Sequence, residues 1–238
     1  PLKTVTLDST KEEIFEAIKE AGLVGLGGAG FPTYVKYNNP KGIHTLLVNG
    51  VECEPFLTTD FVTMKDSVED LLNGCELLMK ASGAEKAIIA IKVHKEEVRD
   101  AIRAQLDSHP NVVVQEVPDV YPMGWERTLI KEVFHKEYDR LPGEIGVVIS
   151  NGQTVISIGS VLLKGHPISE RTITVSGDAV LNPTNVVCKI GTLAKELIDA
   201  VGVNHELDIN LIPGGPMCSK AVNTDLFPMY MQMGALTI

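Results

Sequence analysis

The sequence predicts an α/β fold: a Rossmann-like domain built on a parallel sheet, followed by a small β-grasp (ubiquitin-like) domain. Buried strand patterns alternate with amphipathic helix patterns over residues 44–163, as parallel strands joined by crossover helices require. After residue 167 the order becomes strand, strand, helix, strand. Of the 238 residues, 44% are apolar and 22% charged, which is a normal globular composition. We therefore expect a first domain over 1–167, a second over 168–218 and a C-terminal tail over 219–238.

The first domain is expected to open with an amphipathic helix over residues 10–21, where Thr10 and Glu13 have the spacing of a capping box. A glycine-rich loop follows, and Pro32 suits the first turn of the next helix. The expected strands are 44–49, 86–92, 111–117 and 145–150; the expected helices are 60–82, 94–106 and two more that end at Val133 and Leu163.

The second domain is expected to contain three strands and one helix. Alternating apolar residues predict strands over 171–176, 185–190 and 207–212. A helical pattern runs over 192–201 and stops at Gly202. This order is that of a β-grasp module, whereas the last eighteen residues of the tail, 221–238, have a mixed pattern that predicts no element.

Residues 22–36 contain five glycines in fifteen positions and end at Lys36. Glycine lets the backbone approach a ligand closely, and amides at a helix start near a lysine suit a phosphate. The spacing Gly25-x-Gly27-x-x-Gly30 also matches the dinucleotide fingerprint, but a helix, not a strand, precedes it. We therefore expect a phosphate cradle and reject an ordinary Rossmann crossover here. A plain glycine-rich surface turn is the alternative.

Polar residues follow three of the predicted strands, or begin the next helix. Asn49 is followed by Glu52 and Glu54, and the other two groups are Tyr121-Pro-Met-Gly-Trp-Glu126 and Asn151-Gly-Gln-Thr154. Because the carboxyl ends of parallel strands share one edge of a sheet, these groups and the glycine loop would converge on one crevice. Taken alone, the two glutamates would fit a solvated turn.

Charge and cysteine usage exclude several classes of function. The 21 basic and 31 acidic residues give a net charge of −10 without a basic cluster, so we expect no nucleic-acid partner. Apolar runs are too short for a transmembrane segment. Cys53, Cys75, Cys188 and Cys218 show no C-x-x-C spacing, which predicts a reduced, cytoplasmic protein with no metal site and no iron–sulfur cluster.

Two motifs carry a family resemblance. The segment 25–33 with Lys36, and the segment 47–55, resemble RnfC, the NADH-side subunit of the Rnf electron-transport complex. More distantly they resemble the flavoprotein subunit of respiratory complex I. The likeness covers residues 20–218, and residues 170–212 resemble the soluble-ligand-binding β-grasp domain of this family.

The resemblance implies an NADH-dependent oxidoreductase subunit that binds FMN and accepts hydride from NADH. Electrons would pass to an iron–sulfur subunit or to a soluble reductase. The protein would be cytoplasmic, or peripheral on the cytoplasmic face of a membrane complex. A flavin fits this role because it converts a two-electron hydride into single electrons.

The resemblance also implies roles for individual residues, none of them an acid, a base or a metal ligand. The phosphate and ribityl chain of FMN would contact Gly25, Gly27, Gly28 and Lys36. The flavin crevice would be lined by Asn49, Glu52, Tyr121, Gly124 and Glu126, and closed at the phosphate end by Asn151 and Thr154. On the nicotinamide side, Phe31 would stack and Glu54 would form a hydrogen bond.

Some positions depart from the family pattern. Leu26 and Val51 stand where complex I has arginine and aspartate, Trp125 replaces a small or acidic residue, and Gly152-Gln153 replaces a valine–glutamate pair. Two alternatives follow. The chain could be a flavin-free docking module in which Trp125 fills the place of the ring, or an unrelated Rossmann dehydrogenase with a strand running into Gly25.

Overall fold

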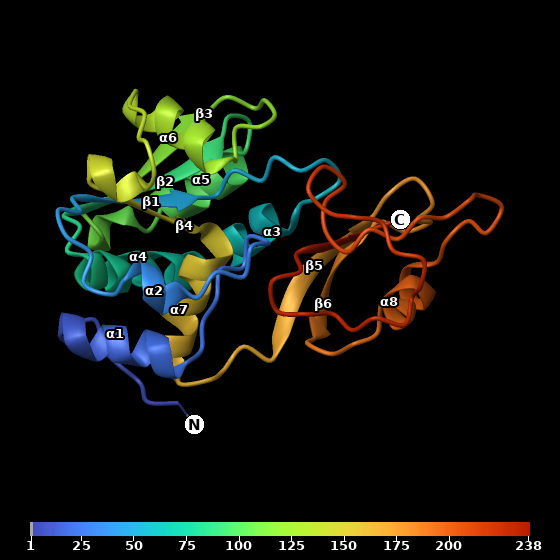
Figure 1. Cartoon of the computed structure of the whole chain (residues 1–238), viewed down its shortest axis with the longest axis horizontal. Helices are drawn as coiled ribbons and strands as arrows, with labels where there is room; N and C mark the ends of the chain where they lie inside the picture. Colours follow the sequence, from blue (N-terminus) through green and yellow to red (C-terminus); the bar gives the residue numbers. More distant parts are fainter. Residues whose placement is uncertain (1) are drawn as a thin grey trace. The chain divides into compact units, whose positions relative to one another are not determined.

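The computed structural model describes residues 2–238, which form two compact units (Figure 1). The first unit comprises the chain up to Gly25, Phe31–Cys53 and Asp60–Pro167. The second comprises Leu26–Gly30, Glu54–Thr59 and Ile168–Ile238. Two short segments of the N-terminal half, one of them in the glycine loop, therefore belong to the unit that the C-terminal third builds.

The first unit is organised around a parallel sheet. Its strands are β1 (Thr45–Asn49), β2 (Lys86–Lys92), β3 (Val112–Val117) and β4 (Val147–Asn151), in the order β3-β2-β1-β4. The predicted α/β class with a parallel sheet is confirmed. The chain runs outward from β1 to β3 and then returns to the far side of β1 for β4. The topological switch point, where open α/β sheets bind ligands, therefore lies between β1 and β4.

Helices cover both faces of this sheet (Figure 1). On one face lie α1 (Lys11–Glu20), α4 (Val68–Ser82) and α7 (Gly152–Lys164). On the other, α6 (Glu126–Phe134) buries Leu129 and Ile130 against Leu47 and Ile149 of the strands. The predicted capping box at Thr10 is confirmed: its hydroxyl accepts from Glu13 N–H, and the Glu13 carboxylate accepts from Thr10 N–H.

The backbones of α4 and α7 approach each other very closely. A Cβ atom placed on Gly159 would lie 2.0 Å from the carbonyl oxygen of Asp70. One placed on Gly74 would lie 2.0 Å from the carbonyl oxygen of Val155. Glycine at both positions therefore sets the spacing of this helix pair, and α7 begins directly after the last residue of β4.

Two predicted helices are shorter than expected. The helix predicted over 60–82 is wrong as one element, because Ser67, with φ −126° and ψ 42°, separates α3 (Thr59–Asp66) from α4. The helix predicted over 94–106 is α5 (Glu96–Arg103) followed by the 3-10 helix η1 (Leu106–Ser108), since His94 has φ 69° and cannot join a helix. The remaining elements are α2 (Thr33–Lys36) and the 3-10 helix η2 (Pro142–Ile145).

The helix predicted after Pro32 is only one turn long, and Pro32 is its N-cap residue. The loop before it is closed by Gly25 N–H, which donates to Phe31 O at 2.7 Å, and by an isolated bridge between Val24 and Pro32. In the described part of the chain α1, not a strand, precedes this loop. This order removes the support for a Rossmann dehydrogenase fingerprint at Gly25.

The second unit contains a three-stranded sheet. The hairpin of β5 (Glu170–Ser176) and β6 (Thr184–Lys189) leads to α8 (Ala194–Val201), and β7 (Ala235–Thr237) pairs in parallel with β5. The core includes Ile173, Val175, Leu197 and Leu236. Segment 54–59 joins this sheet through Thr58 N–H and the Thr59 hydroxyl, which lie 3.0 and 2.7 Å from the hydroxyl of Thr174.

The strand predicted over residues 207–212 is wrong. Leu211 and Ile212 form only isolated bridges, to Val222 and Thr237, and Leu207 is 46% exposed. Its place beside β5 is taken by β7, from the segment for which no element was predicted. All three residues of β7 are buried, so their position follows from tertiary packing and not from an alternating pattern.

Candidate functional site

Asn49 and Asn151 are the last residues of β1 and β4 and face each other in the register of the sheet. The Asn49 side chain donates to Gly124 O at 2.8 Å and accepts from Val51 N–H at 3.0 Å. One amide thus holds the loop before α6 against the end of β1. The switch point of the sheet is bounded by these two side chains.

Gly124 lies against the segment that follows β1. A Cβ atom at this position would lie 2.3 Å from Val51 O and 2.9 Å from the Cys53 sulfur, so only glycine fits. The neighbouring rings of Tyr121 and Trp125 are 42% and 53% exposed and meet edge to face at 6.0 Å. The docking-module alternative requires Trp125 to fill the crevice, and this exposed ring does not fill one.

Lys36 reaches the middle of β4 from α2. Although the residue is exposed, its ammonium donates to Ile149 O at 3.0 Å in a partly buried hydrogen bond. Burial lowers the pKa of Lys36, and the Glu126 carboxylate acts in the opposite direction. Glu126 in turn accepts from the Tyr138 hydroxyl at 2.7 Å. Lys36 and Glu126 are far apart in sequence, but their charges interact in the folded protein.

One buried polar atom beside Lys36 lacks a partner. The Thr33 hydroxyl, one turn earlier on α2, is 2% exposed and makes no hydrogen bond within residues 2–238. Buried hydroxyl groups in folded proteins are normally satisfied by protein or water. Within the same residues, the Lys36 ammonium has no ion-pair partner, and its recorded hydrogen bond is to the carbonyl of Ile149. An anion would supply the Lys36 ammonium with the charge partner that it lacks.

The start of α7 is capped from within. Asn151 Oδ1 accepts from Gln153 N–H at 3.0 Å and from Thr154 N–H at 3.4 Å. Asn151 Nδ2 donates to the Asp60 carboxylate at 3.1 Å, and the Gln153 amide donates to the other oxygen of the same carboxylate. The backbone N–H groups of this first turn therefore already donate to Asn151. Asn151 is linked in turn to Asp60, a residue that the sequence analysis did not identify.

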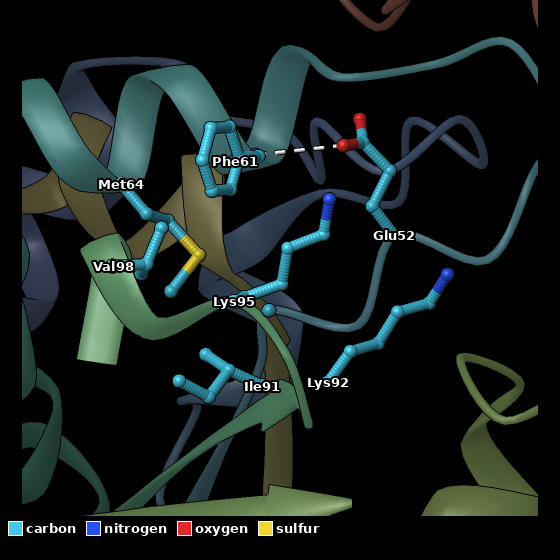
Figure 2. A pocket seen from close by; sticks show the side chains of 8 residues that line it. Glu52, Phe61, Met64, Ile91, Lys92, Lys95 and Val98 are labelled. Carbon is cyan, nitrogen blue, oxygen red and sulfur yellow. Dashed lines mark hydrogen bonds between the residues drawn. The ribbon is translucent and has the colours of Figure 1, made fainter. Parts of the chain in front are cut away.

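Glu52 lines a small pocket at the same edge of the sheet (Figure 2). It accepts from Asp60 N–H at 2.9 Å, and its other oxygen lies 3.5 Å from Phe61 N. Burial, and then the nearby Asp60 carboxylate, raise the pKa of Glu52 to about 7. The enclosed space is about 10 Å³, which is room for one water molecule. The lining residues are Gly50, Glu52, Phe61, Met64, Ile91, Lys92, Lys95 and Val98.

Gly27, Gly28 and Glu54 belong to the second unit. Gly28 has φ +105°, which favours glycine. Glu54 accepts from Met217 N–H at 2.9 Å, while its other carboxylate oxygen is buried without a partner in the described residues. Phe31, in the first unit, is 44% exposed and available for stacking.

The structure gathers most of the predicted ligand residues at one sheet edge of the first unit. Lys36, Asn49, Glu52, Gly124 and Asn151 are linked to β1 and β4 by the contacts above. Asp60, Lys95 and Thr33 were missed; only the position of Asp60 near a helix start could have indicated it. Among the described residues no cluster of histidine, cysteine or carboxylate side chains could hold a metal ion, and no helix is long and apolar enough to cross a membrane.

Comparisons with known proteins agree on one family. The family model described as the Nuo51 FMN-binding domain matches residues 18–160. One component of the proton-translocating ferredoxin:NAD(+) oxidoreductase complex of Clostridium ljungdahlii is 36% identical over 214 residues, which cover 88% of this chain and 47% of that protein. The corresponding component of the Na(+)-translocating ferredoxin:NAD(+) oxidoreductase complex of Acetobacterium woodii is 34% identical, with 88% and 48% covered.

Solved structures agree with the fold. The NAD+-reducing NiFe hydrogenase in the air-oxidized state has a chain that matches with a TM-score of 0.80 at 23% identity, covering 98% of this chain and 47% of that one. The chain thus spans about half the length of these relatives. At this level of identity the likeness to the hydrogenase chain concerns the fold alone.

Proposed function

The chain belongs to the family of Nuo51 FMN-binding domains, and we propose that it binds FMN and accepts hydride from NADH as part of an RnfC-like electron-transfer subunit. Relatives named as components of ferredoxin:NAD(+) oxidoreductase complexes support this proposal. When bound, FMN supplies the conversion of a two-electron hydride into single electrons. The protein's part would be to bind the flavin, to orient it toward NADH and to tune its electronic properties.

The observation that carries the proposal is the Lys36 ammonium on β4. It donates to Ile149, two residues before the carboxyl end of the strand, partial burial disfavours its charge, and within the described residues no carboxylate forms an ion pair with it. The unpartnered Thr33 hydroxyl lies one turn away on the same helix. A monophosphate would neutralise the lysine, so Lys36 fits the charged end of FMN; the Thr33 hydroxyl is buried and would join only if the chain around it moved.

The other ligand residues are proposed on the same basis. Gly25, Gly27 and Gly28 would let the backbone approach the phosphate and ribityl chain. Asn49 and Glu52 would meet the ribityl and ring region, with Tyr121, Gly124 and Glu126 lining the crevice and Asn151 and Thr154 completing it. Because α2 is a single turn, its dipole adds little, and the lysine must supply most of the attraction.

NADH would stack on the Phe31 ring, which is exposed, and would form a hydrogen bond with Glu54. Electrons would leave to an iron–sulfur subunit or a soluble reductase, on the cytoplasmic face of a membrane complex. We also propose that residues 168–218, with β7 from the tail, form a soluble-ligand-binding β-grasp domain. The hairpin, helix and parallel strand of the second unit support this assignment.

A flavin titration tests the proposal. Purified protein should bind FMN, seen as quenching of flavin fluorescence. Lys36→Ala should weaken binding about 10- to 100-fold, because a charge-assisted hydrogen bond contributes roughly 1.5–3 kcal/mol. The matched control is Lys41→Ala, an exposed lysine that should leave affinity unchanged. The proposal is wrong if the wild type shows no affinity at high micromolar FMN, or if both variants bind equally.

A further inference from the structure

Glu52, a proposed flavin contact, lies beside Asp60, to which the proposed function gives no role. The Glu52 carboxyl accepts the backbone N–H of Asp60 at 2.9 Å, so it lies at the first turn of α3. Asp60 is eight positions later in the chain and partly buried. The Glu52 carboxyl therefore lies beside the residue that carries the Asp60 carboxylate, and the charge of Asp60 raises the affinity of Glu52 for a proton.

The two carboxyl groups accept hydrogen bonds from different kinds of donor. Asp60 receives one side-chain amide on each oxygen, from Asn151 at 3.1 Å and from Gln153, and such donors stabilise a carboxylate. Glu52 receives two backbone N–H groups, from Asp60 and Phe61, which also stabilise a carboxylate. Burial and the Asp60 charge outweigh these donors and raise the pKa of Glu52 to about 7, so the proton belongs on Glu52.

The charges facing Glu52 come from three elements. Asp60 approaches from α3, Lys92 lies at the end of β2 and Lys95 in the segment before α5, and Figure 2 shows Lys95 extending toward Glu52. Lys92 is paired with Asp119 at 2.7 Å. The Lys95 ammonium lies 4.6 Å from the centre of the Phe61 ring. Its charge lowers the pKa of Glu52, but this is the smallest of the effects on that pKa.

The pair lies at the switch point of the sheet. Asn151, which donates to Asp60, ends β4 and is the register partner of Asn49 at the end of β1. Glu52 follows Asn49 by three positions. Charge that enters the crevice between β1 and β4 therefore acts on this carboxyl pair across a partly dry environment, where electrostatic interactions are stronger than in water.

We propose that Glu52 and Asp60 hold one exchangeable proton between them, and that Glu52 takes this proton from solvent when negative charge enters the crevice. The second clause rests on the proposed function. In this step a C–H bond of the nicotinamide would break and its hydride, with the electron pair, would pass to the bound flavin and add one negative charge; one O–H bond of hydronium would break, leaving water, as an O–H bond forms on the Glu52 carboxylate. The two charges cancel, and no other bond in the chain forms or breaks.

The first test needs no flavin. Carboxyl carbons of isotope-labelled glutamates are followed by NMR across pH in the unliganded protein. One resonance should titrate near pH 7, vanish in Glu52→Gln and move to lower pH in Asp60→Asn. Glu12→Gln, at an exposed glutamate of α1, should leave it unchanged. Glutamine keeps one oxygen for the shorter bond, from Asp60 N–H, and loses only the long contact with Phe61 N–H, so the variant should fold. If the Glu52 resonance titrates near the ordinary glutamate value of about 4.3, the proposal is overturned.

The second test uses FMN-loaded protein reduced by NADH in weakly buffered solution, with proton uptake read from an indicator dye. At pH values just above 7 the wild type should take up more protons per flavin than Glu52→Gln, and at acid pH the two should agree. Equal uptake at both pH values would overturn the coupling. Failure to bind FMN would overturn the proposed function instead, and the NMR titration would still decide whether the pair holds the proton.

Discussion

At the scale of single residues, the edge of the sheet carries two groups whose charged forms are both disfavoured. Burial lowers the pKa of the Lys36 ammonium and raises that of the Glu52 carboxyl. A protein selected for stability alone would have little reason to keep both at one sheet edge. Opposed shifts of this kind are typical of functional sites, where a ligand supplies the missing partner.

The raised pKa of Glu52 has a consequence for stability. Its folded-state pKa, about 7, exceeds the ordinary value of 4.5, so the folded state binds the proton more tightly than the unfolded chain. The contribution is therefore fully present below pH 4.5 and is lost as pH rises through about 7. Relative to Glu52→Gln, the wild type should lose up to about 3 kcal/mol of unfolding free energy across this window.

Urea unfolding of both proteins at a series of pH values measures this difference. The exposed Glu12→Gln substitution serves as the control and should run parallel to the wild type. A stability difference between wild type and Glu52→Gln that does not change from acid to neutral pH would show that Glu52 titrates normally.

Asn49 is expected to order the loop before α6. Asn49→Asp removes the N–H that donates to Gly124 O and should cost about 1–3 kcal/mol, because the carbonyl loses its partner beside a negative charge. Trp125, the only tryptophan, adjoins this loop, so its fluorescence reports the change. We expect altered emission below the unfolding transition. Unchanged emission and stability would mean that the amide does not position the loop.

At the scale of elements, the spacing of α4 and α7 depends on their glycines. Gly159→Ala would bring its methyl carbon to 2.0 Å from Asp70 O, so the helices must separate. We expect a loss of about 3 kcal/mol, the upper range for overpacking. Because α7 starts at the end of β4, FMN affinity should fall as well.

Gly143→Ala is the matched control for this pair of helices. A methyl group there would meet its nearest neighbour, Ile43, at 3.8 Å, which is ordinary contact. Thermal unfolding of both variants checks the expectation. Equal melting temperatures for Gly159→Ala and the wild type would contradict the close approach.

Most elements of the first unit could be predicted from local patterns. The run Lys86-Ala-Ile-Ile-Ala-Ile-Lys92 is apolar, bounded by charge, and coincides with β2. The break at Ser67 could not be predicted from the sequence, because the apolar periodicity of α3 and α4 continues across it. β7 is three residues long and is selected only by its neighbour β5, so no pattern within residues 235–237 could distinguish it from a loop.

The site was predictable in part, for the same reason. Asn49, Glu52 and Asn151 follow strands directly, so their place at the sheet edge depends on topology alone. The link between Asn151 and Asp60 spans 91 positions, and Lys95 reaches Glu52 from another loop. Such contacts depend on how helices pack on the sheet, which a single sequence does not reveal. The resemblance to RnfC supplied the ligand, which geometry alone would have left as an anion.

At the scale of the whole molecule, residues Leu26–Gly30 of the glycine loop and the segment Glu54–Thr59 belong to the unit that is built mainly from the C-terminal third of the chain. The proposed phosphate residues Gly25 and Lys36 belong to the first unit, and Gly27 and Gly28 to the second. The net charge of −10 agrees with a nucleotide-handling role that relies on local cations and not on a basic surface.

The central claim is that this chain binds FMN so that NADH can reduce it. The most direct measurement is an anaerobic absorbance spectrum of protein loaded with FMN and freed of excess flavin, before and after NADH is added. We expect a retained yellow flavin band that bleaches on addition of NADH and returns with an electron acceptor. A colourless protein, or a bound flavin band that NADH leaves unchanged, would contradict the account.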